Sequence, residues 1–317
     1  MQTSPCLGRN FSKLMLGTVQ FGLDYGIANR SGRPGEAEVR AILAAAWEGG
    51  VNCLDTAAAY GESEEVLGRA LQELNLNGRF TVVSKVRHLE KLQDHASFSE
   101  ISREIEDSVK TSLRRLRLET LPVCLFHHEV PLEYFEVMER LRDKGLIEHY
   151  GASMVDPMNA AAYCGTAEAL QIPFNLLDRR FRDTEDFTAV RESGVALFAR
   201  SVFLQGLIVM PEAEIPPALA AVIPVRRRIA ALAEQAGMPV AELALRYAAT
   251  TEGITCVLVG VDNLEQMREN LTMFDRGPLS ADLMKAVDQA VPRLPETVLN
   301  PVHWPKKSRA AERTRPE

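Results

Sequence analysis

The chain has 317 residues, of which 46% are hydrophobic and 25% are charged, an ordinary composition for a globular protein with a sizeable core. Its net charge of −7 excludes a globally basic surface that would attract nucleic acid. No apolar run is long enough for a membrane span, and no charged start precedes an apolar signal core, so we expect no membrane partner.

Predicted strands and helices alternate along the chain after a polar, irregular lead-in at residues 1–12. Strands are predicted at 13–21, 51–55, 80–85, 122–128, from 147 onward, and at 169–174, 194–199 and 254–260. Helices are predicted at about 36–47, from a Ser63 cap to about 74, through 101–116, and at 132–144. Because these strands read as buried and non-alternating, the pattern predicts eight strand–helix units closed into a (β/α)₈ TIM barrel.

Nothing in the sequence divides this barrel into two domains. We expect a single domain at 1–304, with a proline-containing insertion at about 205–224 between the seventh strand and its helix. The segment 305–317 is charged and lacks apolar residues to bury, which predicts a disordered tail.

The chain contains five cysteines, and their scattered spacing forms no CxxC pair and no metal-ligand pattern. They are Cys6, Cys53, Cys124, Cys164 and Cys256. We therefore expect reduced thiols, a cytoplasmic location and no metal site.

Reactive side chains are predicted at the same end of three successive strands. Asp55 ends one strand and is followed, after four small residues, by Tyr60; Lys85 ends the next; His127 and His128 end the third. An ordinary strand-to-helix turn is the alternative interpretation of the first stretch. An acid, a phenol, an amine and an imidazole at the carboxyl ends of neighbouring strands favour an active site.

These residue types together suit the reduction of a carbonyl group. Tyrosine is a weak acid at neutral pH, and we expect the neighbouring Lys85 cation to lower the pKa of Tyr60. Asp55 is positioned to pair with Lys85 and to offset the cost of burying its charge. His127 is positioned to donate a hydrogen bond to the substrate oxygen.

The motifs around these residues resemble the aldo-keto reductases, whose catalytic tetrad is Asp, Tyr, Lys and His. The tetrad matches lie in DTAAAYG, VVSKV and LFHH. LGTVQFG, GASMVD, PFNLLDRRF, ARSVFLQG and VGVDNLEQMREN match further family landmarks in order, over about 13–290. The resemblance implies a TIM barrel whose catalytic residues are Asp55, Tyr60, Lys85 and His127, with Tyr60 as the general acid/base.

A nicotinamide cofactor is expected, because no protein side chain supplies a hydride. The resemblance implies that the cofactor lies across the barrel mouth, against Gly17, Thr18, Asp55, Ser153, Gln171, Arg200, Ser201, Leu204, Gln205, Gly206, Gly260, Asp262, Gln266 and Asn270. Met154 stands where relatives usually carry Asn, which weakens the grip on the carboxamide. Arg200 stands where relatives often stack a tyrosine on the nicotinamide ring, and a guanidinium plane also stacks on rings.

The loop GVDNLEQMREN leans towards NAD(H) over NADP(H). Asp262 would repel a 2′-phosphate and is suited to accept hydrogen bonds from ribose hydroxyls. Arg268 is the only cation in the segment, and helical spacing turns it away from Gln266. The alternative is that the general family preference for NADP(H) holds, through Arg268 or a basic residue from elsewhere.

The expected substrate is a carbonyl compound, with Phe21 and His128 as candidate walls of its pocket. Because successive strand residues face opposite sides, only one of His127 and His128 is expected to face the pocket, and the resemblance selects His127. LGTVQFGLDYGIAN resembles a branch associated with bacterial sugar and surface-polysaccharide metabolism, which favours an aldose or keto-sugar. The alternative function is a cofactor-binding regulator with a protein partner, such as a channel subunit or cell-division regulator, with little turnover.

Overall fold

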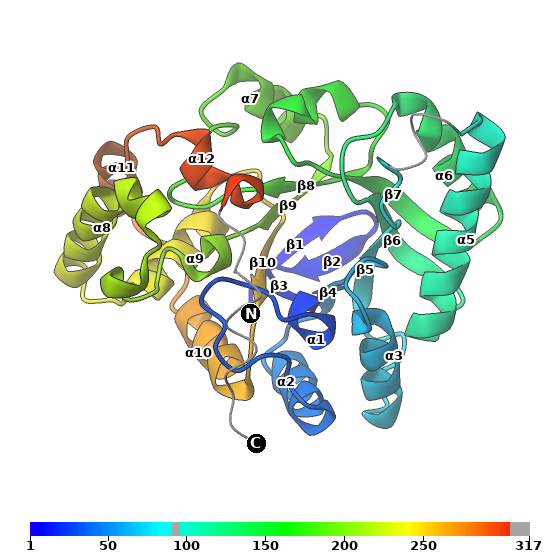
Figure 1. Ribbon diagram of the computed structural model, residues 1–317, viewed down its shortest axis with the longest axis horizontal. Coiled ribbons are helices and arrows are strands. Elements are labelled where there is room, and N and C mark those ends of the chain that lie inside the picture. The colour runs from blue at the N-terminus through cyan, green and yellow to red at the C-terminus, as the bar shows by residue number, and fades with distance from the viewer. Residues whose placement is uncertain (91–95, 305–317) are drawn as a thin grey trace.

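The computed structural model describes residues 1–90 and 96–304, and the predicted tail at 305–317 lies outside this range. Eight strands form a closed parallel barrel in the order β10-β3-β4-β5-β6-β7-β8-β9 (Figure 1). They are β3 (Leu14–Gly17), β4 (Cys53–Asp55), β5 (Thr81–Lys85), β6 (Leu121–Phe126), β7 (Ile147–Ser153), β8 (Ala169–Pro173), β9 (Ala196–Arg200) and β10 (Cys256–Gly260). The predicted (β/α)₈ fold is confirmed.

Helices surround the barrel, as Figure 1 shows. The α-helices are α1 (Val19–Gly22), α2 (Glu36–Glu48), α3 (Ser63–Glu73), α5 (Phe98–Leu116), α6 (Phe135–Asp143), α7 (Glu185–Glu192), α8 (Ile223–Gln235), α9 (Val240–Thr250), α10 (Leu264–Asp275), α11 (Ala281–Ala290) and α12 (Glu296–Leu299). Short 3₁₀ helices are η1 (Leu132–Tyr134), η2 (Pro157–Tyr163), η3 (Leu204–Gly206), η4 (Glu212–Glu214), η5 (Pro217–Val222) and η6 (Pro301–His303). No helix within the described ranges is long and apolar enough to cross a membrane.

The strands are buried on both faces, which explains their continuous apolar runs. β3, β5, β6 and β8 contain only buried residues. Their outward side chains pack under the helices, and their inward side chains form a second cluster inside the barrel. α5 shows how sequence determines a helix here: Ser97 and Glu100 form a capping box, and Arg117 ends the helix in a left-handed conformation.

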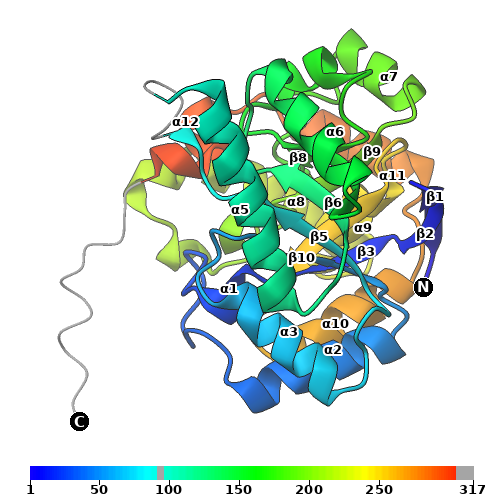
Figure 2. The same ribbon diagram turned by 90° about the vertical axis from the view of Figure 1, so that its right-hand side faces the viewer.

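The expectation that residues 1–12 are irregular is wrong. β1 (Thr3–Cys6) and β2 (Arg9–Ser12) form an antiparallel hairpin, whose two-residue turn places Leu7 and Gly8 at positive φ. Figure 2 shows this hairpin at one end of the barrel, while α1 and α12 lie at the other. The polar sequence concealed the hairpin because its one fully buried ring is Phe11, which meets Phe198 in the barrel floor at 5.7 Å between ring centroids; Cys6 and Leu7 pack partly buried against the same cluster.

Two local predictions also need correction. The first barrel strand ends at Gly17, and the residues expected to extend it form α1. Ser63 does not cap α3; it is the first helical residue, and its hydroxyl bonds Thr18 and Thr56. The insertion after β9 is confirmed in position, and it contains η3, η4 and η5 before α8 begins.

Phe11 provides a test of how much the hairpin stabilises the barrel. Because Phe11 is fully buried, Phe11→Ala is expected to lower the free energy of unfolding by about 3–5 kcal/mol. Urea denaturation measures the loss. Phe98→Ala, at a phenylalanine with 37% exposure, is the matched control and should cost clearly less. Equal losses in the two variants would show that the hairpin does not anchor the floor.

Candidate active site

A cavity of about 740 Å³ opens at the carboxyl ends of the barrel strands. It is lined by the last residues of several strands, among them Gly17, Asp55, Ser153, Arg200 and Gly260. Further predicted site residues on its wall are Tyr60, His127, His128, Gln171, Ser201, Gln205, Gly206, Asp262, Gln266 and Asn270. The fold thus brings most of the predicted site together from segments far apart in sequence.

A buried ion pair lies at the base of the cavity. Lys85 Nζ donates to both carboxylate oxygens of Asp55, at 2.7 and 2.8 Å, and to the backbone oxygen of Thr56 at 2.9 Å. The same ammonium lies 3.4 Å from the hydroxyl of Tyr60. The side chains of Lys85 and Asp55 are 1% and 4% exposed, so water screens this pair very little.

Gln171 extends this network across the barrel. Its Nε2 donates to Asp55 Oδ1 at 2.7 Å, and its Oε1 accepts a 3.4 Å hydrogen bond from Ser153. Parallel pairing of β7 with β8 sets Ser153 beside Gln171. Of the two residues expected to bind the carboxamide, Gln171 therefore bonds Asp55 directly and Ser153 is connected to it through Gln171.

Burial raises the pKa of Tyr60 above its ordinary value, and the nearby Asp55 carboxylate raises it further, while Arg200 acts in the opposite direction. The expectation that Lys85 would lower this pKa does not describe the net effect. Lys85 is bound to both oxygens of Asp55, so the pair presents little net positive charge to the phenol. Tyr60 is accordingly a neutral phenol that holds its proton at physiological pH.

His127 faces Tyr60 with an edge-to-face ring geometry, at 5.5 Å between centroids. Burial, followed by the charges of Lys85 and its histidine neighbours, lowers the pKa of His127 to about 2. The imidazole is therefore neutral at physiological pH. Its Nδ1 is buried and has no hydrogen-bond partner among the described residues, which leaves a polar atom for a ligand at the cavity.

Three histidines meet beside this ring. His88 packs against His127 at 4.3 Å and against His128 at 4.8 Å between centroids. Both His127 and His128 line the cavity, so the expectation that only one of them faces it is wrong. β6 ends at Phe126, and beyond it the chain no longer follows the alternation on which that expectation depended.

Four predicted site residues do not line the cavity. Thr18 is buried and bonds the backbone oxygen of Asp55 and the hydroxyl of Ser63. Phe21, expected in the pocket wall, instead packs in the hydrophobic core, because the turn of α1 directs Gln20 to the cavity in its place. Leu204 is also in the core, and Lys85 lies behind Tyr60.

Comparison with known proteins agrees with this geometry. The model of the aldo/keto reductase family matches residues 13–292. The chain belongs to the aldo-keto reductase family. This membership supports an oxidoreductase that interconverts carbonyl and alcohol groups, and family members generally use NAD(P)H and act on small-molecule carbonyl substrates.

Individual relatives are distant. An uncharacterized oxidoreductase, YqkF of Bacillus subtilis, is 25% identical over 78% of this chain and 85% of its own length. A probable voltage-gated potassium channel subunit beta of Arabidopsis thaliana is 25% identical over 90% of this chain and 97% of its own. The holo structure of the aldo-keto reductase AKR11C1 from Bacillus halodurans superposes with a TM-score of 0.76 at 23% identity, covering 93% of this chain and 97% of that one, which shows a shared fold.

The cavity of this aldo-keto reductase has features that fit a dinucleotide. Ser201, Leu204, Gln205 and Gly206 have positive φ, so the chain after β9 turns sharply where Ser201, Gln205 and Gly206 line the cavity. A Cβ on Gly260 would lie 2.5 Å from the Gln20 amide, so a larger residue there would displace the Gln20 side chain. Gln20 Oε1 is buried without a partner among the described residues, as expected of an atom that bonds a ligand.

Arg200 is held in place at the cavity wall. Its Nη2 donates to the backbone oxygen of Met154 at 2.8 Å, and its Nη1 donates to Ser201 Oγ at 3.2 Å. The Met154 side chain is buried in the core. Met154, which stands where relatives usually carry Asn, therefore contributes its backbone carbonyl. That carbonyl holds Arg200, which stands where relatives often carry tyrosine.

The far end of the cavity is acidic. Asp262 accepts hydrogen bonds from Asn29 at 3.0 Å and from Gln266 at 3.4 Å. Glu269 lines the cavity beside it, whereas Arg268 is exposed and is absent from the wall. Arg200, at the other end, is the only arginine or lysine among the described lining residues.

Sequence reasoning missed several residues of the wall. They include Gln20, Tyr25, Asn29, His88 and Glu90, which all line the cavity. Tyr25 and Asn29 come from the loop after α1, which is rich in Gly, Asn and Arg. Its residues follow no regular spacing that would predict which of them line the cavity. His88 and Glu90 follow β5 within three to five residues of Lys85, and that position was the available clue.

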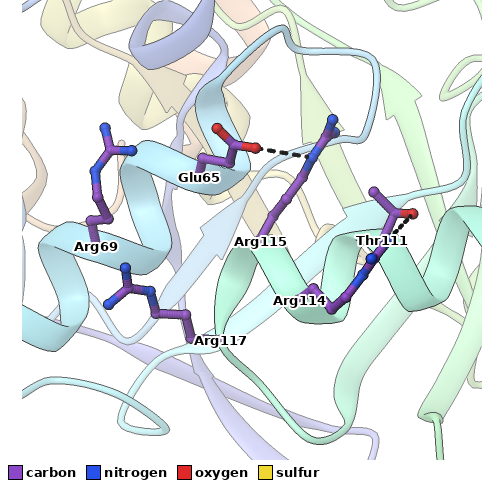
Figure 3. A pocket seen from close by; sticks show the side chains of 6 residues that line it. All are labelled: Glu65, Arg69, Thr111, Arg114, Arg115 and Arg117. Atoms are coloured by element: carbon purple, nitrogen blue, oxygen red, sulfur yellow. Dashed lines mark hydrogen bonds and ion pairs between the residues drawn. The ribbon is translucent and has the colours of Figure 1, made fainter.

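Four arginines surround a separate surface hollow of about 480 Å³ between α3 and α5 (Figure 3). Arg114, Arg115 and Arg117 line it with Arg69. Arg115 lies 3.6 and 3.5 Å from the carboxylates of Glu64 and Glu65, and Arg69 pairs with Glu36. Acidic partners thus balance part of this charge, and the hollow shares no lining residue with the cavity.

The pKa of His127 predicts how stability depends on pH. Between pH 6.5 and about 2 the unfolded chain binds a proton at this residue and the folded protein does not, so the free energy of unfolding falls as pH is lowered. His127→Asn should make this decline shallower by at most about 1.4 kcal/mol per pH unit, the value for one proton. Urea titrations from pH 7 to 4.5 measure both slopes. Parallel slopes would contradict the assignment of a buried, neutral His127.

Proposed function

We propose that this protein is a nicotinamide-dependent reductase of a polar carbonyl compound, with Tyr60 as the proton donor. The observation that carries the proposal is the contact between Lys85 and the Tyr60 hydroxyl at 3.4 Å. Lys85 is paired with Asp55 at 2.7 Å, and Tyr60 lies on a cavity wall that also contains His127. Each residue alone has a structural explanation, but the four together form an acid and its supporting charges around one space.

A bound nicotinamide cofactor supplies the hydride. As negative charge develops on the carbonyl oxygen, Tyr60 transfers its phenolic proton to that oxygen. Neutral His127 donates a hydrogen bond that orients the oxygen and stabilises its charge. Lys85 Nζ donates a hydrogen bond to the Tyr60 oxygen at 3.4 Å, and Asp55 and Gln171 hold Lys85 and the carboxylate in position through their hydrogen bonds.

The electrostatics favour the protonated form of Tyr60, which is the form that reduction requires. Burial and Asp55 raise the pKa of Tyr60, so the phenol carries the proton that reduction consumes. Alcohol oxidation requires the phenolate as base, which this environment disfavours at physiological pH. His127 donates to the oxygen in either direction.

A polar substrate, such as an aldose or keto-sugar, suits the cavity. His88, His128 and Glu90 line it beside His127. These groups offer both donors and acceptors for substrate hydroxyls, whereas an apolar aldehyde would leave them unsatisfied at a cost in binding. The resemblance of the first loop to sugar-associated members supports the same class.

NAD(H) is the cofactor that the acidic end favours. Asp262 and Glu269 line that end without an accompanying lysine or arginine among the described residues. A dianionic 2′-phosphate there would meet like charge, whereas a ribose diol would find acceptors.

A regulatory role with a protein partner is the second candidate. It is favoured by the likeness to the probable potassium channel subunit beta, which extends over 97% of that relative. Absence of turnover across aldehydes, ketones and aldoses, with tight cofactor binding and recovery of a partner in a pull-down, would establish this role over the reductase.

The proton donor is tested by Tyr60→Phe, which removes one hydroxyl and little volume. Turnover of the best carbonyl substrate should fall by about 10²-fold or more, while cofactor binding persists. Steady-state oxidation of the reduced cofactor measures the loss, and fluorescence titration measures binding. Tyr134→Phe, on η1 and outside the cavity lining, is the matched control and should retain wild-type rates. Wild-type turnover in Tyr60→Phe would refute the mechanism.

Cofactor choice is tested by titrating both reduced cofactors at physiological salt. NADH should bind at least about 10-fold more tightly than NADPH, the factor that corresponds to about 1.4 kcal/mol of like-charge repulsion. Asp262→Asn should reduce this ratio, and Arg268→Ala should leave it unchanged because Arg268 does not line the cavity. Tighter binding of NADPH that is lost in Arg268→Ala would reverse the assignment.

A further inference from the structure

The cavity contains a group of potential metal ligands that take no part in the proposed hydride and proton transfers. His88, Glu90 and His128 each present one donor atom, and these atoms all lie within 4.8 Å of one another. The sequence predicted no metal site, because His128 is separated from the other two by about 40 positions and the three follow no ligand spacing.

We propose that His88, Glu90 and His128 bind one divalent transition-metal ion, with Zn²⁺ as the best-fitting ion. Two imidazoles and one carboxylate form a ligand set that zinc uses when it retains an open position. The inference stands independently of the reductase proposal, because metal binding does not require turnover.

The three side chains lie near the spacing that such an ion requires. Zinc lies about 2.0–2.1 Å from imidazole nitrogen, so tetrahedral donors are about 3.3–3.4 Å apart. His88 Nδ1 and His128 Nδ1 are 3.4 Å apart, and His128 Nε2 is 3.3 Å from Glu90 Oε1. These two short distances involve different nitrogens of His128, and only one of them can face a single ion. With one donor atom from each residue the three donors lie within 4.8 Å of one another, so they have to draw closer together when an ion enters.

One ring has to turn for both imidazoles to point at the same ion. The rings of His88 and His128 are stacked with only 18° between their planes, and lone pairs of stacked rings do not converge. His88 and Glu90 are exposed, whereas His128 is 8% exposed and held in the wall. The adjustment therefore falls on the exposed His88 ring and the Glu90 carboxylate, which have space to move.

The position of the site gives the ion access to the reaction space. All three donors line the cavity, and His88 also packs against His127. Coordination positions not occupied by the protein are available to water or to an oxygen of a small molecule in the cavity. Turning His88 towards the ion also removes its stacking contact with His127.

Titration of the purified, metal-free chain with Zn²⁺ alone tests the site by calorimetry. We expect one equivalent with a Kd of about 10 µM or tighter, weakened at least about 10-fold in His88→Ala and in Glu90→Gln, two exposed positions where folding should be preserved. His149→Ala is the matched control, because His149 and Glu168 form another histidine–carboxylate pair at 3.1 Å, and it should bind as wild type does.

Co²⁺ spectroscopy identifies the ligands without relying on activity. We expect d–d bands in the wild type that are lost in His88→Ala and retained in His149→Ala. The proposal is overturned if the wild type takes up no equivalent tighter than about 100 µM, or if His88→Ala and Glu90→Gln bind unchanged. A thiolate-to-cobalt charge-transfer band would equally overturn it, by assigning the ion to a cysteine.

Discussion

The buried pair of Asp55 and Lys85 is the interaction on which the site depends. Both side chains are almost fully buried, so neither charge is tolerable without the other, and removing one partner of such a pair typically costs about 3–5 kcal/mol. The barrel compensates for this burial with backbone and side-chain partners. Lys85 also bonds the Thr56 carbonyl, and Asp55 accepts from Gln171. The same bonds that make the charges tolerable hold the ammonium beside the Tyr60 hydroxyl.

This pair determines the electrostatics of the cavity. Burial is the main cause of both neighbouring shifts, and each charge of the pair adds to one of them: burial and Asp55 raise the pKa of Tyr60, and burial and Lys85 lower the pKa of His127 to about 2. Both residues are therefore neutral hydrogen-bond donors at physiological pH. Arg200, bound to the carbonyl of Met154, supplies positive charge at the wall. A neutral acid near fixed positive charge is an arrangement suited to an oxygen that becomes negative.

Much of the fold and of this site follows from local sequence. Apolar runs ending in Asp55, Lys85 and His127 predicted buried parallel strands, because strands covered on both faces carry no polar alternation. The polar groups that end them predicted the active face, because parallel strands in a barrel direct their carboxyl ends to one side. The sequence likewise placed the acidic Asp262 in the loop after the last strand. Helical spacing turned Arg268 away from Gln266, and Arg268 is exposed.

The sequence by itself determined which residues end the strands. Only the tertiary structure decided which side chains from other segments contact those residues. The N-terminal hairpin could not be read from its polar residues, because its stability comes from Phe11 entering a barrel floor that exists only when all eight strands close. Phe21 entered the core and Gln20 the cavity because α1 turns the chain, a turn that tertiary packing selects. His88 met His127 and His128 through the adjacency of β5 and β6, which local periodicity does not encode. Contacts between side chains depend on the relative placement of whole elements, and that placement is set by closure of the barrel.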